Sequence, residues 1–405
     1  MVLGRVAGKA AETSARLLWE RAAKPRATSV ADVPAGPDAI TREWLESILC
    51  RDYPGVRIVS FRETGRSSGS SIRRRFAIEY DERGRNILVQ QNGRRGGLPA
   101  SVFAKMTSTF STRMAHGVSQ TMAAEACFFR EIRRHLELEA PWGYHGAADL
   151  RTFRSIQLME DLTATRGATF CTPASEISRQ KAEDAMGVLA AIHAPFHCDS
   201  RLDTAYTALK TLPGWYELPI QAFELDRHHE RAMTKAAHVF PPEVSARRDE
   251  VWPSFLRAVA LHDSLPQTLI HSDVHLGNWY VTDRGRMGLC DWGCIAKGHW
   301  SRDLAYALST MLRIDDRRAW ERELIELYLD RLRAAGGPAV SFDETWLRYR
   351  QQMFIALLMW TPTLCHSRLL PNMQPEATAI EMISRISTTL DDLESLDAFR
   401  ADDPG

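Results

Sequence analysis

The sequence predicts an α+β protein in which a small strand-rich part is followed by a larger, mainly helical part. Short segments with alternating apolar and polar side chains crowd into residues 56–160, whereas apolar residues recur at helical spacing in most of the chain beyond residue 160. The chain of 405 residues is longer than one core usually accommodates, so we expect two lobes or domains. Its composition, 44% hydrophobic and 25% charged, is that of an ordinary globular protein.

Residues 1–38 are predicted to form an amphipathic helix followed by a linker. Leu17, Leu18 and Trp19 give the helix an apolar side, but the segment lacks the continuous apolar core of a signal peptide. We expect the helix to pack against the rest of the chain or against a partner. The linker, residues 25–38, is rich in proline, alanine and small polar residues.

Residues 39–161 are expected to form the first lobe, a small antiparallel sheet with helices. One helix is predicted within 38–49, where Trp44 and Ile48 recur at helical spacing, and another within 121–136. The predicted strands are 56–61, 76–80, 101–106 and 155–160. A loop rich in glycine and serine, 64–71, joins the first two strands.

Residues 162–405 are expected to form the second lobe, which is mostly helical. The apolar residues of 181–196 lie on one stripe, as a buried helix face requires. A later helix is predicted to end at a pair of glycines, 336–337, and the next begins with a capping box formed by Ser341 and Glu344.

The charges of the chain balance, with 51 lysines and arginines against 51 aspartates and glutamates. A formal net charge of zero argues against a dedicated nucleic-acid-binding protein. Local basic runs at 72–76 and 92–97 are more simply explained as a solvated strand edge and a loop than as polyanion sites.

Seven widely spread cysteines, in a chain large enough to fold without disulfides, favour a reducing cytoplasm. Cys290 and Cys294 have a CxxxC spacing, but no second Cys/His pair stands nearby to complete a zinc site. The longest apolar run, 353–360, is too short to cross a bilayer. We therefore expect a soluble, cytoplasmic protein with no membrane span and no nucleic-acid partner.

Oxygen-bearing side chains gather around a predicted hairpin. The strands expected there are 268–270, 279–281 and 287–290. Asn278 directly precedes the second strand and Asp291 directly follows the third, so the two residues meet at one end of an antiparallel pair. Oxygen ligands without thiolates or paired imidazoles suit Mg²⁺, so Asn278 and Asp291 are the candidate metal ligands. Asp273, on the loop entering the same place, is the candidate base.

The segments HSDVHLGNWYV, LCDWG and RDLAYAL together resemble the aminoglycoside phosphotransferase and choline kinase superfamily, and most closely its ecdysteroid-kinase-like branch. The resemblance implies a bilobal protein-kinase-like fold, with a small antiparallel-sheet N-lobe and a larger, mainly helical C-lobe. It also implies that Asp273 is the catalytic base, that His271 braces the catalytic loop, and that Asn278 and Asp291 hold Mg²⁺. Asp303 resembles an acidic residue that supports this loop, and a helix N-cap is the alternative.

The same resemblance implies an ATP site in the first lobe. Lys105 matches the strand lysine that contacts the α- and β-phosphates, and Glu125 matches the helix glutamate that pairs with it. Met159, Glu160 and Leu162 fall in the expected hinge, where backbone groups hold the adenine and the side chain of Glu160 is solvated.

The glycine- and serine-rich loop departs from the protein-kinase pattern G-x-G-x-x-G. Its backbone amides and hydroxyls are candidates to cap phosphates, although a flexible hairpin tip explains the composition almost as well. The candidate residues are Gly65, Ser68, Gly69 and Ser70.

The acceptor is expected to be a small molecule, because no APE sequence closes an activation segment that would present a peptide. His275 stands where protein kinases have lysine, and is a candidate contact of the transferring phosphoryl group or a structural hydrogen-bond partner. No acidic cluster suited to a polycationic antibiotic is evident, which favours an apolar or amphipathic alcohol. The candidate acceptor walls are Trp215, Tyr216, Phe223, Met359 and Trp360.

The sequence thus predicts an ATP-dependent small-molecule kinase. The main alternative is a non-catalytic kinase-like binding or scaffold protein, and a protein kinase and an aminoglycoside kinase are further alternatives. Choline as acceptor would call for an aromatic cage. Suitable residues at all the positions that the chemistry needs argue against the scaffold.

Overall fold

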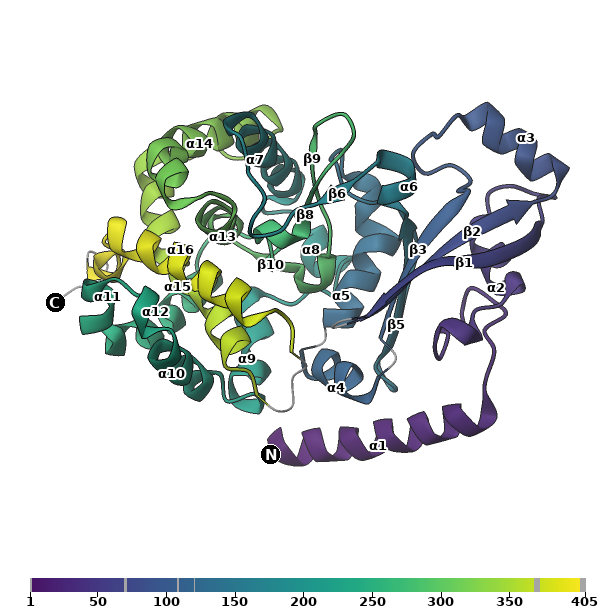
Figure 1. Ribbon diagram of the computed structural model, residues 1–405, viewed down its shortest axis with the longest axis horizontal. Helices are drawn as coiled ribbons and strands as arrows, with labels where there is room; N and C mark the ends of the chain where they lie inside the picture. The colour runs from purple at the N-terminus through teal and green to yellow at the C-terminus, as the bar shows by residue number, and fades with distance from the viewer. Residues whose placement is uncertain (1, 69–70, 108, 120, 368–371, 401–405) are drawn as a thin grey trace. The chain divides into compact units, whose positions relative to one another are not determined.

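The chain forms two compact units, Met1–His135 with Ala140–Ala168, and Leu136–Glu139 with Thr169–Gly405. A computed structural model describes residues 2–68, 71–107, 109–119, 121–367 and 372–400 (Figure 1). The first unit contains a five-stranded antiparallel sheet, and the second is mostly helical with two small antiparallel sheets. This is the α+β arrangement that the sequence predicts.

The sheet of the first unit has the strand order β1-β2-β3-β5-β4. The elements of this unit are α1 (Val2–Ala23), α2 (Arg42–Leu49), β1 (Ile58–Ser68), β2 (Ile72–Tyr80), α3 (Glu82–Gln91), β3 (Ser101–Thr107), α4 (Phe110–Ser119), α5 (Thr121–Cys127), β4 (Gly143–Asp149), β5 (Arg154–Glu160) and α6 (Leu162–Arg166). A π-helical segment, Phe128–Ile132, continues α5.

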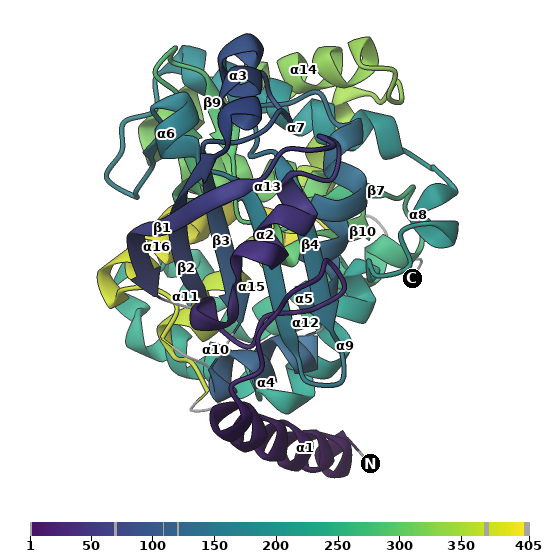
Figure 2. The ribbon, with the colours of Figure 1, turned by 90° about the vertical axis from the view of Figure 1, so that its right-hand side faces the viewer.

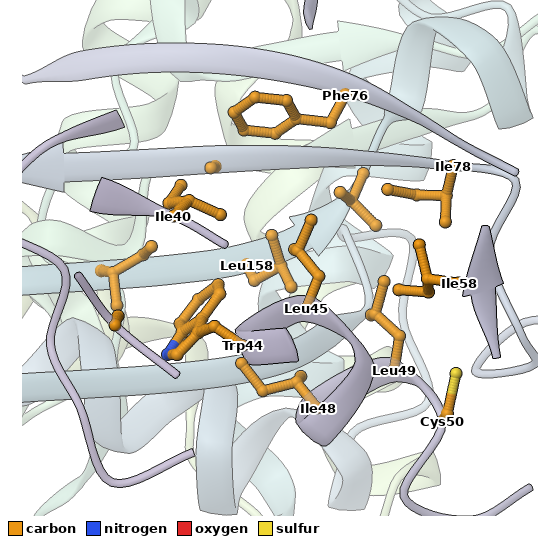
Figure 3. Close-up of a cluster of buried hydrophobic side chains, with 14 of the residues drawn as sticks. Ile40, Trp44, Leu45, Ile48, Leu49, Cys50, Ile58, Phe76, Ile78 and Leu158 are labelled. Carbon is orange, nitrogen blue, oxygen red and sulfur yellow. The ribbon is translucent and has the colours of Figure 1, made fainter. Parts of the chain in front are cut away.

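One face of this sheet packs against α2. Thr41 caps α2 by accepting a hydrogen bond from the backbone N–H of Trp44, and the apolar side of the helix then lies on the sheet (Figure 3). In β3 the side chains of Val102, Ala104 and Met106 enter this core, because alternate residues of a strand point to the same face. Lys105 therefore leaves β3 on the opposite face.

The structure corrects several expectations for this unit. Strand β1 runs through Ser68, so half of the segment expected as a loop, 65–68, is paired with β2. The basic run 72–76 lies in β2, an interior strand, and not at a sheet edge. The sequence did not predict α3, α4 or β4; in β4 the residues are small or polar, and no alternation of apolar side chains marks the strand.

Helix α1 lies beside α4 (Figure 2), and a buried ion pair joins the two helices. Arg113 of α4 is fully buried, and its Nη1 lies 3.0 Å from Oε2 of Glu20, which is also buried. Arg154, at the start of β5, lies with its Nε 3.4 Å from Oε1 of the same carboxylate. Burial lowers the pKa of Arg113, and the charge of Glu20 opposes that effect. The helix expected to pack against the rest of the chain is thus attached through one carboxylate that serves two arginines.

The second unit is built around α13 (Ser301–Met311), every residue of which is buried. Around it lie α7 (Arg179–His193), α14 (Ile314–Ala334), α15 (Phe342–Leu364) and α16 (Glu376–Asp392). Ser341 caps α15 by accepting a hydrogen bond from the N–H of Glu344, as predicted. The other helices are α8 (Arg201–Thr204), α9 (Leu212–Ala222), α10 (Leu225–Lys235), α11 (Pro242–Ala246) and α12 (Arg248–Ala260).

The second unit also contains two small sheets, most of whose strands lie near the predicted site residues 271–291 in the sequence. One has the order β6-β8-β9, with β6 at Thr169–Phe170, β8 at Trp279–Val281 and β9 at Met287–Leu289. The other pairs β7 (Thr268–Ile270) with β10 (Ala296–Gly298). The hairpin β8–β9 has the predicted position, and its turn contains Gly285 in a left-handed conformation with φ +76°. In the described part of the chain, none of the helices has the length and apolarity needed to cross a membrane.

Replacing Glu20 with glutamine tests the attachment of α1. Glu20→Gln leaves Arg113 and Arg154 buried without their shared carboxylate, so we expect the free energy of unfolding to fall by about 3 kcal/mol. Urea denaturation measures this change. Glu12→Gln, at an exposed position of the same helix, is the control and should change stability by less than about 0.5 kcal/mol. Equal effects of the two substitutions would contradict the role given to Glu20.

Candidate active site

Lys105 and Glu125 form an ion pair in the first unit. Lys105 Nζ lies 2.8 Å from Glu125 Oε1, and their side chains are only 12% and 7% exposed. Lys105 comes from β3 and Glu125 from α5, so the pair ties this helix to the sheet. A pair so little exposed to water is weakly screened by salt.

Two glycines in β4 allow the carboxylate of Glu125 to reach Lys105. A Cβ atom at Gly146 would lie 2.3 Å from the carbonyl oxygen of Ala126, and one at Gly143 would lie 2.5 Å from that of Phe129. No side chain fits at either distance, so only glycine lets α5 and its π-helical continuation lie this close to the sheet. Glu125 directly precedes Ala126, and this close approach brings its carboxylate to Lys105.

The expected hinge residues lie where β5 ends and α6 begins. Met159 and Glu160 are in β5, and Leu162 is the first residue of α6. Glu160 is buried and not solvated as expected; its carboxylate accepts hydrogen bonds from the N–H of Trp142 at 3.0 Å and from Arg166 Nε at 2.8 Å. Burial alone would raise the pKa of Glu160, but the bond from Arg166 and a bond from the Thr165 hydroxyl hold it below its usual value.

The four candidate residues of the glycine- and serine-rich segment divide between β1 and its end. Gly65 and the backbone of Ser68 belong to β1. Gly69 and Ser70 lie outside the described residues. The paired part of this segment is therefore strand, and the connection to β2 is shorter than predicted.

The loop between β7 and β8, residues 271–278, is held by Asp303 of α13. The carboxylate of Asp303 accepts hydrogen bonds from the backbone N–H groups of His271 at 2.6 Å and Ser272 at 2.8 Å. Ser272 is in a left-handed conformation with φ +64°, which turns both N–H groups toward Asp303. Arg302 Nη2 donates to the carbonyl of Ser272 at 3.0 Å, so neighbouring residues of α13 hold both sides of this strained position.

Asp303 is fully buried and charged. Burial alone would raise its pKa, but the hydrogen bond to His193 Nε2 at 3.3 Å and the charges of nearby groups hold its pKa below the usual value. The alternative that Asp303 is a helix N-cap is wrong, because it is the third residue of α13 and Trp300 occupies the N-cap position.

His271 connects this loop to the residue before Asp291. Its Nδ1 accepts from the N–H of Asp273 at 3.3 Å, so the ring proton resides on Nε2, which lies 3.1 Å from the carbonyl oxygen of Cys290. Burial lowers the pKa of His271, which keeps the ring neutral.

Asp273 and Asn278 lie side by side. Asn278 Nδ2 donates to the backbone carbonyl of Asp273 at 2.7 Å and to its Oδ2 at 3.0 Å. Tyr306 of α13 points its hydroxyl at Asp273 Oδ1, 3.4 Å away. Burial, with the nearby charge of Asp273, raises the pKa of Tyr306 well above its usual value, so this hydroxyl is a donor.

His275 is held in one tautomer next to Asp273. Its Nδ1 accepts from the N–H of Gly277 at 3.1 Å, so in the neutral ring Nε2 carries the proton. This Nε2 lies 3.9 Å from Asp273 Oδ2, beyond hydrogen-bond distance. The ring packs edge-on against Trp360 of α15, with centroids 5.2 Å apart.

Asn278 and Asp291 come from the two arms of the β8–β9 hairpin. The N–H of Cys290 donates to the carbonyl of Asn278 at 2.9 Å, which closes the end of the hairpin, and Asp291 follows in a left-handed conformation with φ +60°. Because both acceptors of Asn278 Nδ2 are on Asp273, the amide oxygen of Asn278 points away from Asp273. Amide and carboxylate oxygens are suitable ligands of Mg²⁺, and oxygens of water and phosphate complete its coordination shell. Within the described ranges, no group of three or more His, Cys, Asp or Glu residues could hold a metal alone.

Of the five candidate acceptor-wall residues, Trp360 contacts this loop, and Trp215, Tyr216 and Met359 contact one another. Tyr216 of α9 donates its hydroxyl to Met359 Sδ at 3.4 Å and packs against Trp215, with ring centroids 4.7 Å apart. Trp360 contacts His275, as described above. Burial raises the pKa of Tyr216 to about 12, and Asp273 contributes to that shift. Phe223 is buried at the end of α9.

Three residues near the loop were not among the predicted site residues: His193, Arg302 and Tyr306. A signal for Tyr306 was present, because it follows Asp303 by three residues and so shares its side of a helix. Arg302 lies over the ring of Tyr306, 4.4 Å from its centroid. His193 carried no sequence signal, since it reaches Asp303 from α7 across the core.

Replacing Gly146 tests the close approach of α5. Gly146→Ala places a Cβ against the carbonyl of Ala126, so we expect a loss of about 1–3 kcal/mol of stability. Thermal and urea unfolding measure it. The control is Gly187→Ala in α7, where a Cβ meets nothing within 4 Å, and we expect it to stabilise the protein by about 0.4–1 kcal/mol. A Gly146→Ala protein as stable as wild type would show that α5 moves away without cost.

Replacing Asp303 with asparagine tests the support of the loop. The amide can accept one of the two backbone N–H groups but turns an NH₂ toward the other, so we expect a loss of about 2–3 kcal/mol. Hydrogen exchange of a peptide covering residues 268–278 should speed up. Asp283→Asn, in the exposed β8–β9 turn, should leave this exchange unchanged. Unchanged exchange in Asp303→Asn would remove Asp303 from its supporting role.

Comparison with known proteins places the chain in a family. Its sequence matches the profile of the phosphotransferase enzyme family (APH) over residues 72–348. None of the curated proteins matches the sequence.

Similar solved structures include choline kinase LicA from Streptococcus pneumoniae, 12% identical, covering 86% of this chain and 98% of that one, with a TM-score of 0.42. An ethanolamine kinase from Plasmodium vivax is 10% identical, covering 91% of this chain and 92% of that one, with a TM-score of 0.45. ADP-bound aminoglycoside phosphotransferase APH(2'')-Ib is 14% identical, covering 85% and 96%, with a TM-score of 0.39. Since the family profile spans more than half of the sequence, the chain belongs to the phosphotransferase enzyme family (APH).

Proposed function

We propose that this phosphotransferase moves the γ-phosphoryl group of ATP to a hydroxyl group of a small molecule. The observation that carries the proposal is the loop 271–278, which a buried carboxylate fixes so that Asp273 and Asn278 lie in contact. A base beside a metal ligand is the arrangement that phosphoryl transfer requires. Family membership supports the reaction class, and the acceptor is part of the proposal.

In this proposal Asp273 is the catalytic base. It orients the acceptor hydroxyl and takes its proton as the bond to phosphorus forms. Lys105 contacts the α- and β-phosphates, and Glu125 holds its ammonium group in place. His271 fixes the loop without carrying charge.

Asn278 and Asp291 are the proposed ligands of Mg²⁺. The ion, when bound, neutralises charge on the phosphates of ATP. The chain's own contribution is to hold the two oxygen donors at one end of a closed hairpin. His275, with its proton on Nε2, is a proposed donor to the transferring phosphoryl group.

The adenine and the phosphate cap are assigned to the first unit. Met159, Glu160 and Leu162 form the proposed hinge, where backbone groups would hold the base. Gly65 and Ser68, with Gly69 and Ser70 from outside the described residues, are proposed to cap the phosphates.

We propose an apolar or amphipathic alcohol as acceptor, and a place in the ecdysteroid-kinase-like branch. The contact of Trp360 with His275 and that of Tyr216 with Met359 support this choice. None of the seven cysteines, all of which lie in the described residues, forms a disulfide, which supports the proposed cytoplasmic location.

The test begins with nucleotide binding. The melting temperature of the full chain is measured with ATP, with Mg²⁺ and with both. At about 100 times the dissociation constant we expect about 2.7 kcal/mol of stabilisation from Mg·ATP. Asp291→Ala should lose most of the Mg²⁺-dependent part. No stabilisation of wild type under any condition would favour the scaffold alternative.

A second variant separates binding from chemistry. Asp273→Asn should keep the Mg·ATP stabilisation and lose about 10²–10⁴-fold in turnover with a panel of alcohols. The panel compares hydrophobic alcohols with choline and with an aminoglycoside, and a protein mixture is included as acceptor. Wild-type turnover by Asp273→Asn would rule out its role as base, and transfer only to choline, the aminoglycoside or proteins would overturn the proposed acceptor.

A further inference from the structure

A row of polar residues crosses the sheet of the first unit at the level of Lys105. The strand registers pair Ser67 of β1 with Arg73 of β2, Arg73 with Lys105 of β3, and Lys105 with Gln157 of β5. Directly opposed residues of antiparallel strands project from the same face, with Cβ atoms about 5 Å apart. Arg73 therefore leaves the sheet beside Lys105, on the face opposite the packed core.

The two sides of Lys105 differ. On the β5 side Gln157 is buried and α5 packs on β4 and β5, so helix and strand cover that side. Gln157 Nε2 has no hydrogen-bond partner among the residues that the structure describes. On the β2 side stand Arg73, which is half-buried, and Ser67, which is exposed. Arg73 and Ser67 are thus the less buried neighbours of Lys105 in this row.

The two arginines after Arg73 in β2 make contacts away from Lys105. Arg74 is paired with Ala104, a residue of the packed core, and its Nε lies 3.3 Å from Glu63 Oε2. Arg75 Nη2 donates to the Thr163 hydroxyl at 2.8 Å, and its Nε lies 3.5 Å from Asp161 Oδ1. Of the three, Arg73 is the one that the register sets directly opposite Lys105.

We propose that Arg73 is a second cation for the polyphosphate of the nucleotide. The register places Arg73 directly opposite Lys105, whose ammonium group Glu125 holds at 2.8 Å, so a phosphate that contacts Lys105 lies within reach of Arg73. A guanidinium also offers a bidentate pair of N–H donors to phosphate oxygens. Arg73 and Lys105 thus select for a nucleoside carrying two or more phosphates. This inference rests on the proposed function, because it uses the same nucleotide.

The test compares two adjacent arginines. Arg73→Met and Arg74→Met remove the same charge one residue apart, from opposite faces of the same strand. Dissociation constants for Mg·ATP, Mg·ADP and adenosine are measured by calorimetry on the full chain. For Arg73→Met we expect at least about a tenfold rise for Mg·ATP and Mg·ADP and none for adenosine, since phosphate contacts are charge-assisted. Arg74→Met should leave all three constants unchanged.

A third variant, Arg73→Lys, keeps the proposal testable if Arg73→Met does not fold. Arg73→Lys keeps the charge but not the bidentate geometry, so its dissociation constant for Mg·ATP should lie between those of wild type and Arg73→Met. If only Arg73→Lys folds, its dissociation constant should still exceed that of wild type by a few-fold. Unchanged Mg·ATP binding in Arg73→Met, or in Arg73→Lys where it stands alone, would overturn the assignment. So would equal losses in Arg73→Met and Arg74→Met, which would indicate a general effect of the strand. Wild-type protein that binds no Mg·ATP would overturn the proposed function and this assignment together.

Discussion

The buried carboxylate of Asp303 is the constraint on which the proposed catalytic loop depends. A loop that turns through a left-handed serine exposes two successive N–H groups, and inside a protein these need an acceptor. Asp303 supplies one oxygen to each. A buried charge of this kind is costly unless hydrogen bonds surround it, and the bond to His193 adds a third. Because every residue of α13 is buried, the loop is attached to the interior of its unit.

The first unit positions its ion pair by a different means. The position of Glu125 depends on the absence of side chains at Gly143 and Gly146 of β4, which lets the backbone of α5 lie on the sheet. A close backbone contact leaves α5 little freedom to shift, because protein interiors are densely packed. In the first unit, therefore, a close backbone contact places the charged pair, whereas in the second unit a buried carboxylate holds the loop.

These two features also explain which parts of the fold and of the site the sequence predicts. The short strands β7, β8 and β9 and the positions of Asn278 and Asp291 were predictable, because turn residues and spacing determine a hairpin locally. Strand β4 is not predicted from the sequence, because its apolar residues do not alternate. Its glycines instead allow α5 to lie close to the sheet. The β1 extension was missed because glycine and serine indicate a loop, whereas pairing with β2 decides the outcome. Glu160 was expected to be solvated, and only the three-dimensional position of Arg166 and Trp142 shows why it is buried.

The hydrogen bonds of Asp273 indicate from which side an acceptor would reach it. Oδ2 is occupied by the amide of Asn278 at 3.0 Å, which a metal bound through the Asn278 oxygen would leave in place. Oδ1 has the Tyr306 hydroxyl at 3.4 Å, longer than the usual 2.5–3.0 Å of a bond between two oxygens. A weakly held oxygen is the one that can accept another hydroxyl without losing a good bond. The acceptor would then approach Oδ1 beside Tyr306, near the ring of His275 and the Trp360 ring that packs on it, surroundings that suit an alcohol on an apolar body.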